Sequence, residues 1–472
     1  MPQHAYSQFS VHTGSRRDLT AAQRGIWYAQ ELDPENPMYQ IAQYVEIHGE
    51  LDSEVLAEAA QAAVAQTDAL NVRFAEDDDG PHQILHPSRV QLHLTDLRDS
   101  QQATNGRSHD GGALERARVL MDEDLATPRT MASDELLRLE LFHIEDARYL
   151  FYQRVHHVML DGYSAVLVLR RIAALYRQLL ASTAEQSSPS VTEPEKLTRF
   201  PSLDVLLSEE TTYLNSPHAA SDQAFWEDSL SHHGPAVGLA ARPTGQANRL
   251  IRLSKQLPED IVDNLRNGAS TAPATILASV AIYLHKMTAE RDIGLSLPVT
   301  ARRGALAKSV PSMMSNVVPV RMKVSPEATV QNTVANAAAA LRNSLIHQQF
   351  RLESLHSRTS YSGPSVNILP VIEKIAFGSA SGSMNILSTG PIDDLSIVIH
   401  GLQPSTDTPG SDTGIITMQF EANAELYSRD AVEDHLQRLL DLLRKITASP
   451  ESTSAALTLT TPAEEQELLE LG

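Results

Sequence analysis

Cysteine is absent from this sequence of 472 residues. The chain therefore contains no disulfide, no thiolate nucleophile and no cysteine-ligated metal. Basic residues are in deficit, because 38 Lys and Arg stand against 59 Asp and Glu and leave a formal net charge of −21. Charge of this sign disfavours nucleic acids and anionic membranes as partners. Small molecules and other proteins are the expected ligands.

Long hydrophobic runs are also missing. No apolar stretch reaches the roughly 18 residues that a membrane helix needs, and the polar start at residues 1–14 lacks a signal-peptide core. We therefore expect a cytoplasmic protein with no membrane partner. Hydrophobic residues make up 42% of the chain, which is ordinary for a globular protein, and the length is sufficient for two or more domains.

One stretch has the composition of a chemical site, namely HHVMLDG at residues 156–162. Before it, residues 149–155 alternate with the period of a strand, so His156 and His157 are expected to point to opposite faces. After it, Ser164 is placed to cap a helix whose apolar residues recur every three or four positions. The sequence predicts a strand-to-helix corner that holds an imidazole in a cleft, beside a carboxylate and a backbone N–H.

Adjacent histidines at a strand end are often ordinary core or surface residues, so the whole pattern has to be weighed. Two histidines, an aspartate and a glycine at this fixed spacing are expected by chance in about one such chain in a thousand. A metal site is disfavoured, because the two imidazoles diverge and neither a cysteine nor an HxxxH helix supplies further ligands. The motif therefore favours catalysis.

HHVMLDG followed by Tyr163 and Ser164 resembles the HHxxxDG signature of condensation domains of nonribosomal peptide synthetases, which are relatives of chloramphenicol acetyltransferase. Other segments resemble further motifs of the family in the same order. These are residues 19–27 (family form SxAQxRLW), 66–74 (RHExLRTxF, here with Gln66 and Asn71 where arginines are usual), 314–321 (NxxPxR) and 347–349 (HQD, here with Gln349). The resemblance covers nearly the whole chain.

The resemblance implies an α/β (α+β) fold of two chloramphenicol acetyltransferase-like lobes. They are expected to form a V-shaped pseudo-dimer with His157 at the floor of a through-channel. Residues 182–201 are rich in Ser, Pro and Glu, as interdomain linkers are. We predict an N-terminal lobe at residues 1–181 that carries the motif, a C-terminal lobe at 202–460 and the start of a linker to a following domain at 461–472.

The resemblance also implies amide formation, in which the α-amine of an acceptor thioester attacks a donor thioester. His157 matches the position that orients or deprotonates this amine, and the sequence leaves both roles open. Gly162 is expected to let the chain turn and to aim its N–H at the developing oxyanion. His156 is expected to support the strand.

Asp161 is interpreted as structural, because a carboxylate that is buried without a charge partner is costly. Arg321 and Arg73 are the candidate partners. The candidates for lining the substrate channel are Tyr163, Ser164, Asn316, His347 and Asn367.

The implied partners are donor and acceptor carrier proteins, peptidyl or aryl, and the adenylation domain of a larger synthetase. The chain itself is expected to be a monomer. It needs no metal and no bound cofactor, since the substrates arrive on 4′-phosphopantetheine arms. Segments 152–154, 366–368 and 390–395 resemble condensation domains of siderophore synthetases, which accept an aryl-acid donor.

Related classes of protein fit less well. Epimerisation domains share HHxxxDG but carry Trp where this chain has Ala165. Heterocyclisation domains have aspartates in place of the histidines. Acyltransferases that act on free alcohols usually carry DFGWG, which the region around residues 394–396 lacks. A catalytically silent scaffold that only docks carrier proteins stays open as an alternative.

Overall fold

The computed structural model describes residues 14–98, 112–131, 135–185, 198–231, 236–240, 247–355, 363–369, 374–402 and 415–460, with residues 464, 466 and 470. The chain forms two compact units, each with its own six-stranded sheet. The first unit comprises Met1–Leu214, Arg302–Met314 and Lys374–Gly390, and the second comprises Asn215–Ala301, Ser315–Glu373 and Pro391–Gly472. The α/β class and the presence of two lobes agree with the predicted fold.

The bounds of these units differ from those of the predicted lobes, because each unit is assembled from segments that lie far apart in the chain. Helix α5 (Leu203–Leu214) belongs to the first unit, as do strands β12 (Ile375–Phe377) and β13 (Ala380–Thr389). Strand β13 pairs antiparallel with β2 (Gln40–His48). Ladder hydrogen bonds between segments so distant in sequence leave no trace in local composition, which is why the predicted boundary followed composition instead. Most of the predicted linker lies outside the described residues.

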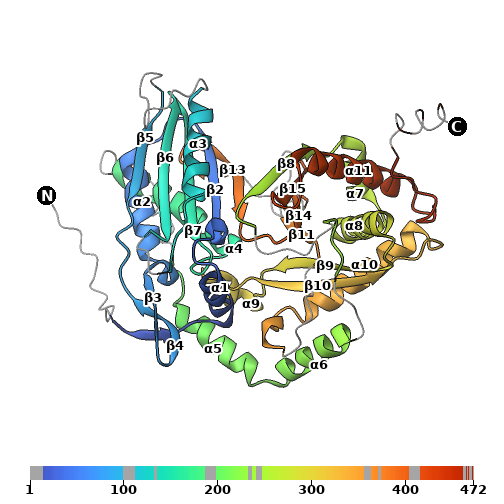
Figure 1. Cartoon of the computed structure of the whole chain (residues 1–472). Helices are drawn as coiled ribbons and strands as arrows, with labels where there is room; N and C mark the ends of the chain where they lie inside the picture. Colours follow the sequence, from blue (N-terminus) through green and yellow to red (C-terminus); the bar gives the residue numbers. More distant parts are fainter. Residues whose placement is uncertain are drawn as a thin grey trace. The chain divides into compact units, whose positions relative to one another are not determined.

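The first unit is built on the sheet β12-β13-β2-β7-β6-β5. Its other strands are β5 (Leu92–Asp96), β6 (Leu137–Glu145) and β7 (Arg148–His156), and β6 and β7 form an antiparallel hairpin. Helices α2 (Ser53–Ala65) and α4 (Gly162–Glu185) cover one face, and α3 (Ala113–Leu125) covers the other (Figure 1). Along β7, Phe151 and Val155 pack into the core between the sheet and helices α2 and α4. Leu150 and Tyr152 pack into the core between the sheet and α3, which confirms the predicted alternation.

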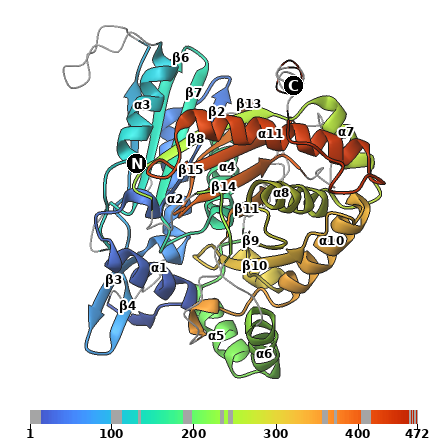
Figure 2. The same cartoon turned by 45° about the vertical axis from the view of Figure 1, so that its right-hand side comes forward.

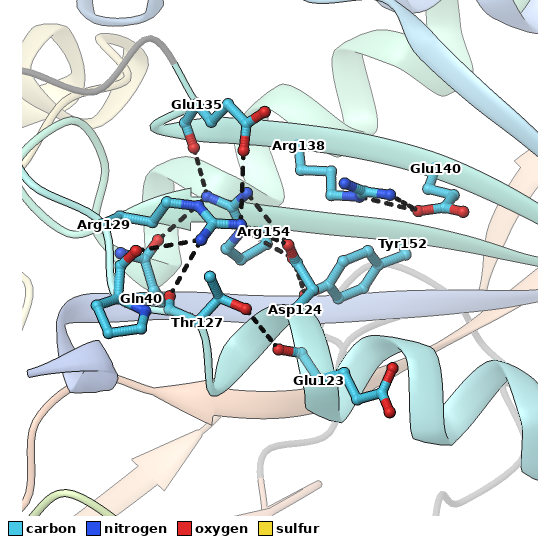
Figure 3. A network of polar contacts seen from close by, with 11 residues as sticks. Gln40, Glu123, Asp124, Thr127, Arg129, Glu135, Arg138, Glu140, Tyr152 and Arg154 are labelled. Atoms are coloured by element: carbon cyan, nitrogen blue, oxygen red, sulfur yellow. Dashed lines mark hydrogen bonds and ion pairs between the residues drawn. The ribbon is translucent and has the colours of Figure 1, made fainter. Parts of the chain in front are cut away.

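Paired charges anchor α3 to this sheet. The side chain of Arg154 is 1% exposed and donates from Nε to Asp124 at 2.9 Å. The Tyr152 hydroxyl and Arg129 donate to the same carboxylate, so that the groups converge in Figure 3. Buried charges are tolerated when they are paired and hydrogen-bonded. The network therefore holds the end of β7 that leads into the motif.

Helix α1 (Ala21–Leu32) begins at a capping box, because the Thr20 hydroxyl and the Gln23 side chain each accept the other's backbone N–H. Trp27 on this helix is buried. The remaining elements of the first unit are η1 (Pro37–Tyr39), η2 (Asp68–Leu70), α9 (Gly304–Ser309) and a small sheet in the order β1-β4-β3, made of β1 (Arg16–Asp18), β3 (Val72–Asp77) and β4 (Gly80–Leu85).

The second unit has the sheet β10-β9-β11-β14-β15-β8. Its strands are β8 (Leu250–Gln256), β9 (Asp292–Val299), β10 (Asn316–Lys323), β11 (Ser365–Leu369), β14 (Leu395–His400) and β15 (Thr417–Asn423). Its helices are α6 (Pro217–Ser231), α7 (Glu259–Asn267), α8 (Ala272–Thr288), η4 (Leu352–Ser354), α10 (Val330–Ile346) and α11 (Arg429–Ala448). Figure 2 shows α8, α10 and α11 gathered over one face of this sheet. Leu436, Leu439, Leu440 and Leu443 form a stripe along α11 that is buried there.

Candidate active site

The motif forms the predicted corner between a strand and a helix. Strand β7 ends at His156, α4 begins at Gly162, and the backbone N–H of His157 donates to the carbonyl of Tyr39 at 2.8 Å. The helix cap is Asp161 and not Ser164, because Oδ1 of Asp161 accepts the N–H of Ser164 at 2.9 Å. The predicted cap is therefore wrong by three residues, and Ser164 lies inside the first turn.

The charge partner of Asp161 is Arg302. Nη1 of Arg302 donates to Oδ2 at 2.6 Å and Nη2 to Oδ1 at 3.3 Å, and the two side chains are 0% and 2% exposed. Burial alone would raise the pKa of Asp161, but the charge and hydrogen bonds of Arg302 hold that pKa below its usual value. Asp161 is therefore ionised, and it braces the corner.

This ion pair corrects the predicted partners. Arg321 pairs with Asp292 at 3.2 Å within the second unit, and Arg73 lies exposed on β3 opposite Ile84. Arg302 follows β9 in the stretch TARRG. In the sequence, these two successive arginines after a buried strand are the only indication that Arg302 has a structural role. No local pattern predicts which of them reaches a carboxylate 141 positions earlier.

Ser164 belongs to the same buried network and not to a substrate-lined surface. Its hydroxyl donates to the carbonyl of Ser312 at 2.8 Å and accepts from Arg302 at 2.7 Å and from the N–H of Ser312 at 2.9 Å. All of its hydrogen-bonding capacity is thus used. These bonds argue against the predicted contact of Ser164 with a substrate channel. Tyr163, by contrast, is 37% exposed.

His156 is enclosed and neutral. It is fully buried, its Nδ1 accepts the N–H of Val158 at 3.2 Å, and its Nε2 lies 3.1 Å from Oε1 of Gln30. The proton is therefore on Nε2, which donates to Gln30. Burial lowers the pKa of His156 to about 3, with a smaller contribution from the neighbouring His157. The side chain joins β7 to α1 and has no spare proton for chemistry.

His157 is the imidazole of the motif that lacks such partners. It is 8% exposed, and within the described part of the chain its buried Nδ1 has no hydrogen bond of ordinary geometry. Burial lowers its pKa, and the negative charge of Asp161 opposes this shift only in part. The ring is therefore neutral near pH 7 and carries a free lone pair, as a base or a hydrogen-bond acceptor requires.

Gly162 is the first residue of α4. Its φ is not positive, and a Cβ placed on it would meet no heavy atom within 4 Å. The turn therefore does not require a glycine, contrary to the reason predicted from the sequence. What glycine provides is open space beside a helix N-terminus, where the first N–H groups have no acceptor inside the helix.

The other predicted channel residues lie in the second unit. Asn316 is 4% exposed and donates to the carbonyls of Gln348 and Phe350. His347 bonds to Asp222 through Nδ1 at 2.7 Å and stacks on a neighbouring aromatic ring. These contacts belong to the packing of the second unit and argue against direct substrate contact by either residue. Asn367 lies on β11 opposite Val398.

Two negative findings apply to the part of the chain that the structure describes. It contains no cluster of three or more His, Asp or Glu suited to hold a metal ion. Nor does any helix in it combine the length and apolar character that crossing a membrane demands.

Known proteins are similar to this chain over nearly its whole length. The family described as Condensation domain matches residues 16–469. A dimodular nonribosomal peptide synthase of Bacillus subtilis (strain 168) is 31% identical over 96% of this chain and 18% of its own length. Enterobactin synthase component F of Escherichia coli (strain K12) is 26% identical over 96% of this chain and 34% of its own length. The chain thus spans only a fifth to a third of these relatives.

A solved structure of the starter condensation domain of rhizomide synthetase, a mutant in complex with C8-CoA, is also similar. It superimposes with a TM-score of 0.83 at 27% identity and covers 94% of this chain and 98% of that one. The fold and corner define an acyltransferase of the HHxxxDG class. The chain belongs to the condensation-domain family of nonribosomal peptide synthetases, whose members form amide bonds.

Proposed function

We propose that this chain joins a donor acyl thioester to the α-amine of an acceptor aminoacyl thioester, with both substrates on phosphopantetheine arms of carrier proteins. The observation that carries the proposal is the neutral, enclosed imidazole of His157 at the HHxxxDG corner. The partners would be two carrier proteins and an adenylation domain, in keeping with relatives several times longer than this chain. The monomeric state and the cytoplasmic location stay predictions.

The proposed chemistry suits the protonation state of this imidazole. An α-amine has a pKa of roughly 8 and attacks only as the free base. The C–N bond forms as the amine adds to the donor carbonyl, the C–S bond then breaks, and the amine's proton passes to Nε2 of His157 and on to the departing thiolate. A ring that is neutral near pH 7 can accept that proton or align the amine. The first N–H groups of α4, at Gly162, would stabilise the oxyanion.

For the donor we propose an aryl acid, as in siderophore synthesis. Support comes from the resemblance of segments 152–154, 366–368 and 390–395 and from the similarity to enterobactin synthase component F. A fatty-acyl donor is the competing choice, because the rhizomide synthetase domain was solved with C8-CoA. Intact masses of both carriers, after incubation with aryl, fatty-acyl and aminoacyl donors, would separate these choices.

The role of His157 is tested with two variants. If the imidazole removes a proton in the slow step, His157→Ala and His157→Gln should both lower the single-turnover rate by roughly 10²–10⁴. If it only aligns the amine, His157→Gln should keep most of the activity near pH 8, because much of the amine is already neutral there. Preloaded carriers at saturating concentration and a pH series from about 6.5 to 9 isolate the chemical step.

Wild-type rates in both variants would contradict any role of His157. Absence of amide formation by the wild type itself would instead favour a domain that only docks carriers. Arg444→Gln is a suitable control, since this side chain lies in an exposed ion pair with Asp260. Its rate should equal that of the wild type.

A further inference from the structure

Gly390 ends the segment that carries β13 and lies against His157. The last paired residue of β13, Thr389, is opposite Ile41, and Gly390 follows it with φ of +108°. A Cβ built on Gly390 would lie 2.7 Å from Cδ2 and 3.1 Å from Nε2 of His157. The first distance is far below van der Waals contact between carbon atoms. A side chain at this position would therefore require the imidazole to move.

Neither backbone can yield easily. The N–H of His157 is bonded to the carbonyl of Tyr39, directly before β2. On the other side, β13 is paired along β2, and the buried hydroxyl of Ser388 donates to the carbonyl of Gln40 at 2.8 Å. Both segments are thus anchored to the same strand. The displacement would fall on the imidazole ring, whose Nδ1 has no hydrogen bond of ordinary geometry among the described residues.

The position of the missing side chain is otherwise open. After the two atoms of His157, the nearest heavy atom to the built Cβ is Cγ2 of Ile41 at 3.9 Å. The built Cβ lies closer to Cδ2 than to Nε2, so a side chain here would press on the edge of the ring. Within the described residues, its clash is therefore confined to the imidazole of His157.

We propose that Gly390 is a positioning residue for the reaction, because its lack of a side chain keeps the His157 imidazole in the orientation that the reaction requires. This inference rests on the proposed function, in which His157 acts on the acceptor amine. Gly390 acts on the reaction only through the position of this imidazole.

The test compares two alanine substitutions at glycines of nearly equal conformation. Gly80, the first residue of β4, has φ of +101°, and a Cβ on it would meet nothing within 4 Å. Gly80→Ala therefore reports backbone strain alone. With preloaded carriers, Gly390→Ala should lower the single-turnover rate about 10²-fold, the effect of a misplacement of roughly 1 Å, while Gly80→Ala should match the wild type. Equal rates in the two variants would overturn the proposal.

A second measurement does not depend on activity. In the wild-type background Gly390→Ala should lower the melting temperature more than Gly80→Ala does, because it adds a clash to the strain. In a His157→Ala background the two substitutions should cost the same, since the ring is gone. Gly390→Ala should then also leave the residual rate unchanged. An excess cost that persists without the ring would contradict the contact with His157.

The outcomes separate this inference from the proposed function. If His157→Ala is as active as the wild type, the proposed role of His157 fails, while the melting temperatures still report whether residues 157 and 390 are coupled. If His157→Ala is inactive and Gly390→Ala is fully active, only the positioning role fails. Should Gly390→Ala not fold, the variant that also carries His157→Ala must fold, and its failure to do so would equally refute the proposal.

Discussion

Asp161 performs two structural tasks with one carboxylate. Oδ1 caps α4 by accepting the N–H of Ser164, and Oδ2 accepts from Arg302 and from the N–H of Met314. The charge partner is completely buried, so a loss of the negative charge leaves a guanidinium enclosed without a counter-charge. The motif aspartate therefore holds the shape of the corner. Burial lowers the pKa of the neighbouring His157, and the negative charge of Asp161 offsets part of that shift.

At this scale we predict that Asp161→Asn lowers both stability and activity. Asparagine keeps an oxygen for the helix cap but loses the charge, and breaking a buried ion pair from one side costs about 3–5 kcal/mol. Urea unfolding measures the loss. Asp260→Asn breaks the exposed pair with Arg444 and should cost less than about 1 kcal/mol. Unchanged stability with lost activity would instead indicate a direct chemical role for Asp161.

At the scale of elements, α1 supports the motif through two glutamines seven residues apart, hence on one face of the helix. Gln23 donates to the carbonyl of Val158 at 3.1 Å, and Gln30 accepts the proton of His156. The resemblance of residues 19–27 to the first family motif thus has a physical basis. These side chains serve the corner between β7 and α4 rather than the reaction.

The joint between α1 and β7 makes stability depend on pH. The pKa of His156 is about 3 in the folded chain and close to 6.5 when unfolded, so below pH 6.5 the unfolded state binds the extra proton. Stability should be full above pH 6.5 and fall towards pH 3, by at most about 1.4 kcal/mol per pH unit for this group. His156→Gln should remove the part of the pH dependence of the unfolding free energy that comes from this one titrating group. Urea unfolding at pH 5, 6 and 7 measures it. An unchanged slope would contradict the assignment.

At the scale of the whole molecule, the first unit depends on segments from distant parts of the chain. Its sheet takes β12 and β13 from residues 375–389, and its corner takes Arg302 from a segment that follows β9 of the second unit. A chain cut after α5 would leave β2 as an edge strand and Asp161 buried without its arginine. Unpaired edge strands promote aggregation.

We therefore predict that a fragment of residues 14–214 does not unfold cooperatively on its own. Circular dichroism during heating and size-exclusion chromatography would show a broad transition and aggregates, whereas the full chain in the same buffer should melt cooperatively. A monomeric fragment with a sharp transition would show that the first unit folds without its distant segments.

Several features of this protein were determined by the sequence alone, because short-range physics encodes them. The alternation before His156, the capping box at Thr20 and the leucine stripe of α11 each record which face is buried or which N–H needs an acceptor. Residue identity and spacing likewise indicate the chemistry of the motif. All of this information spans a few turns or one strand at most.

The tertiary structure decided the rest. It selected Arg302 over Arg73 and Arg321, turned Ser164 inward and placed Gly390 against the ring of His157. Each of these contacts joins positions far apart in the chain. They depend on where β9 and β13 end in space, and no periodicity in the residues between them records that geometry.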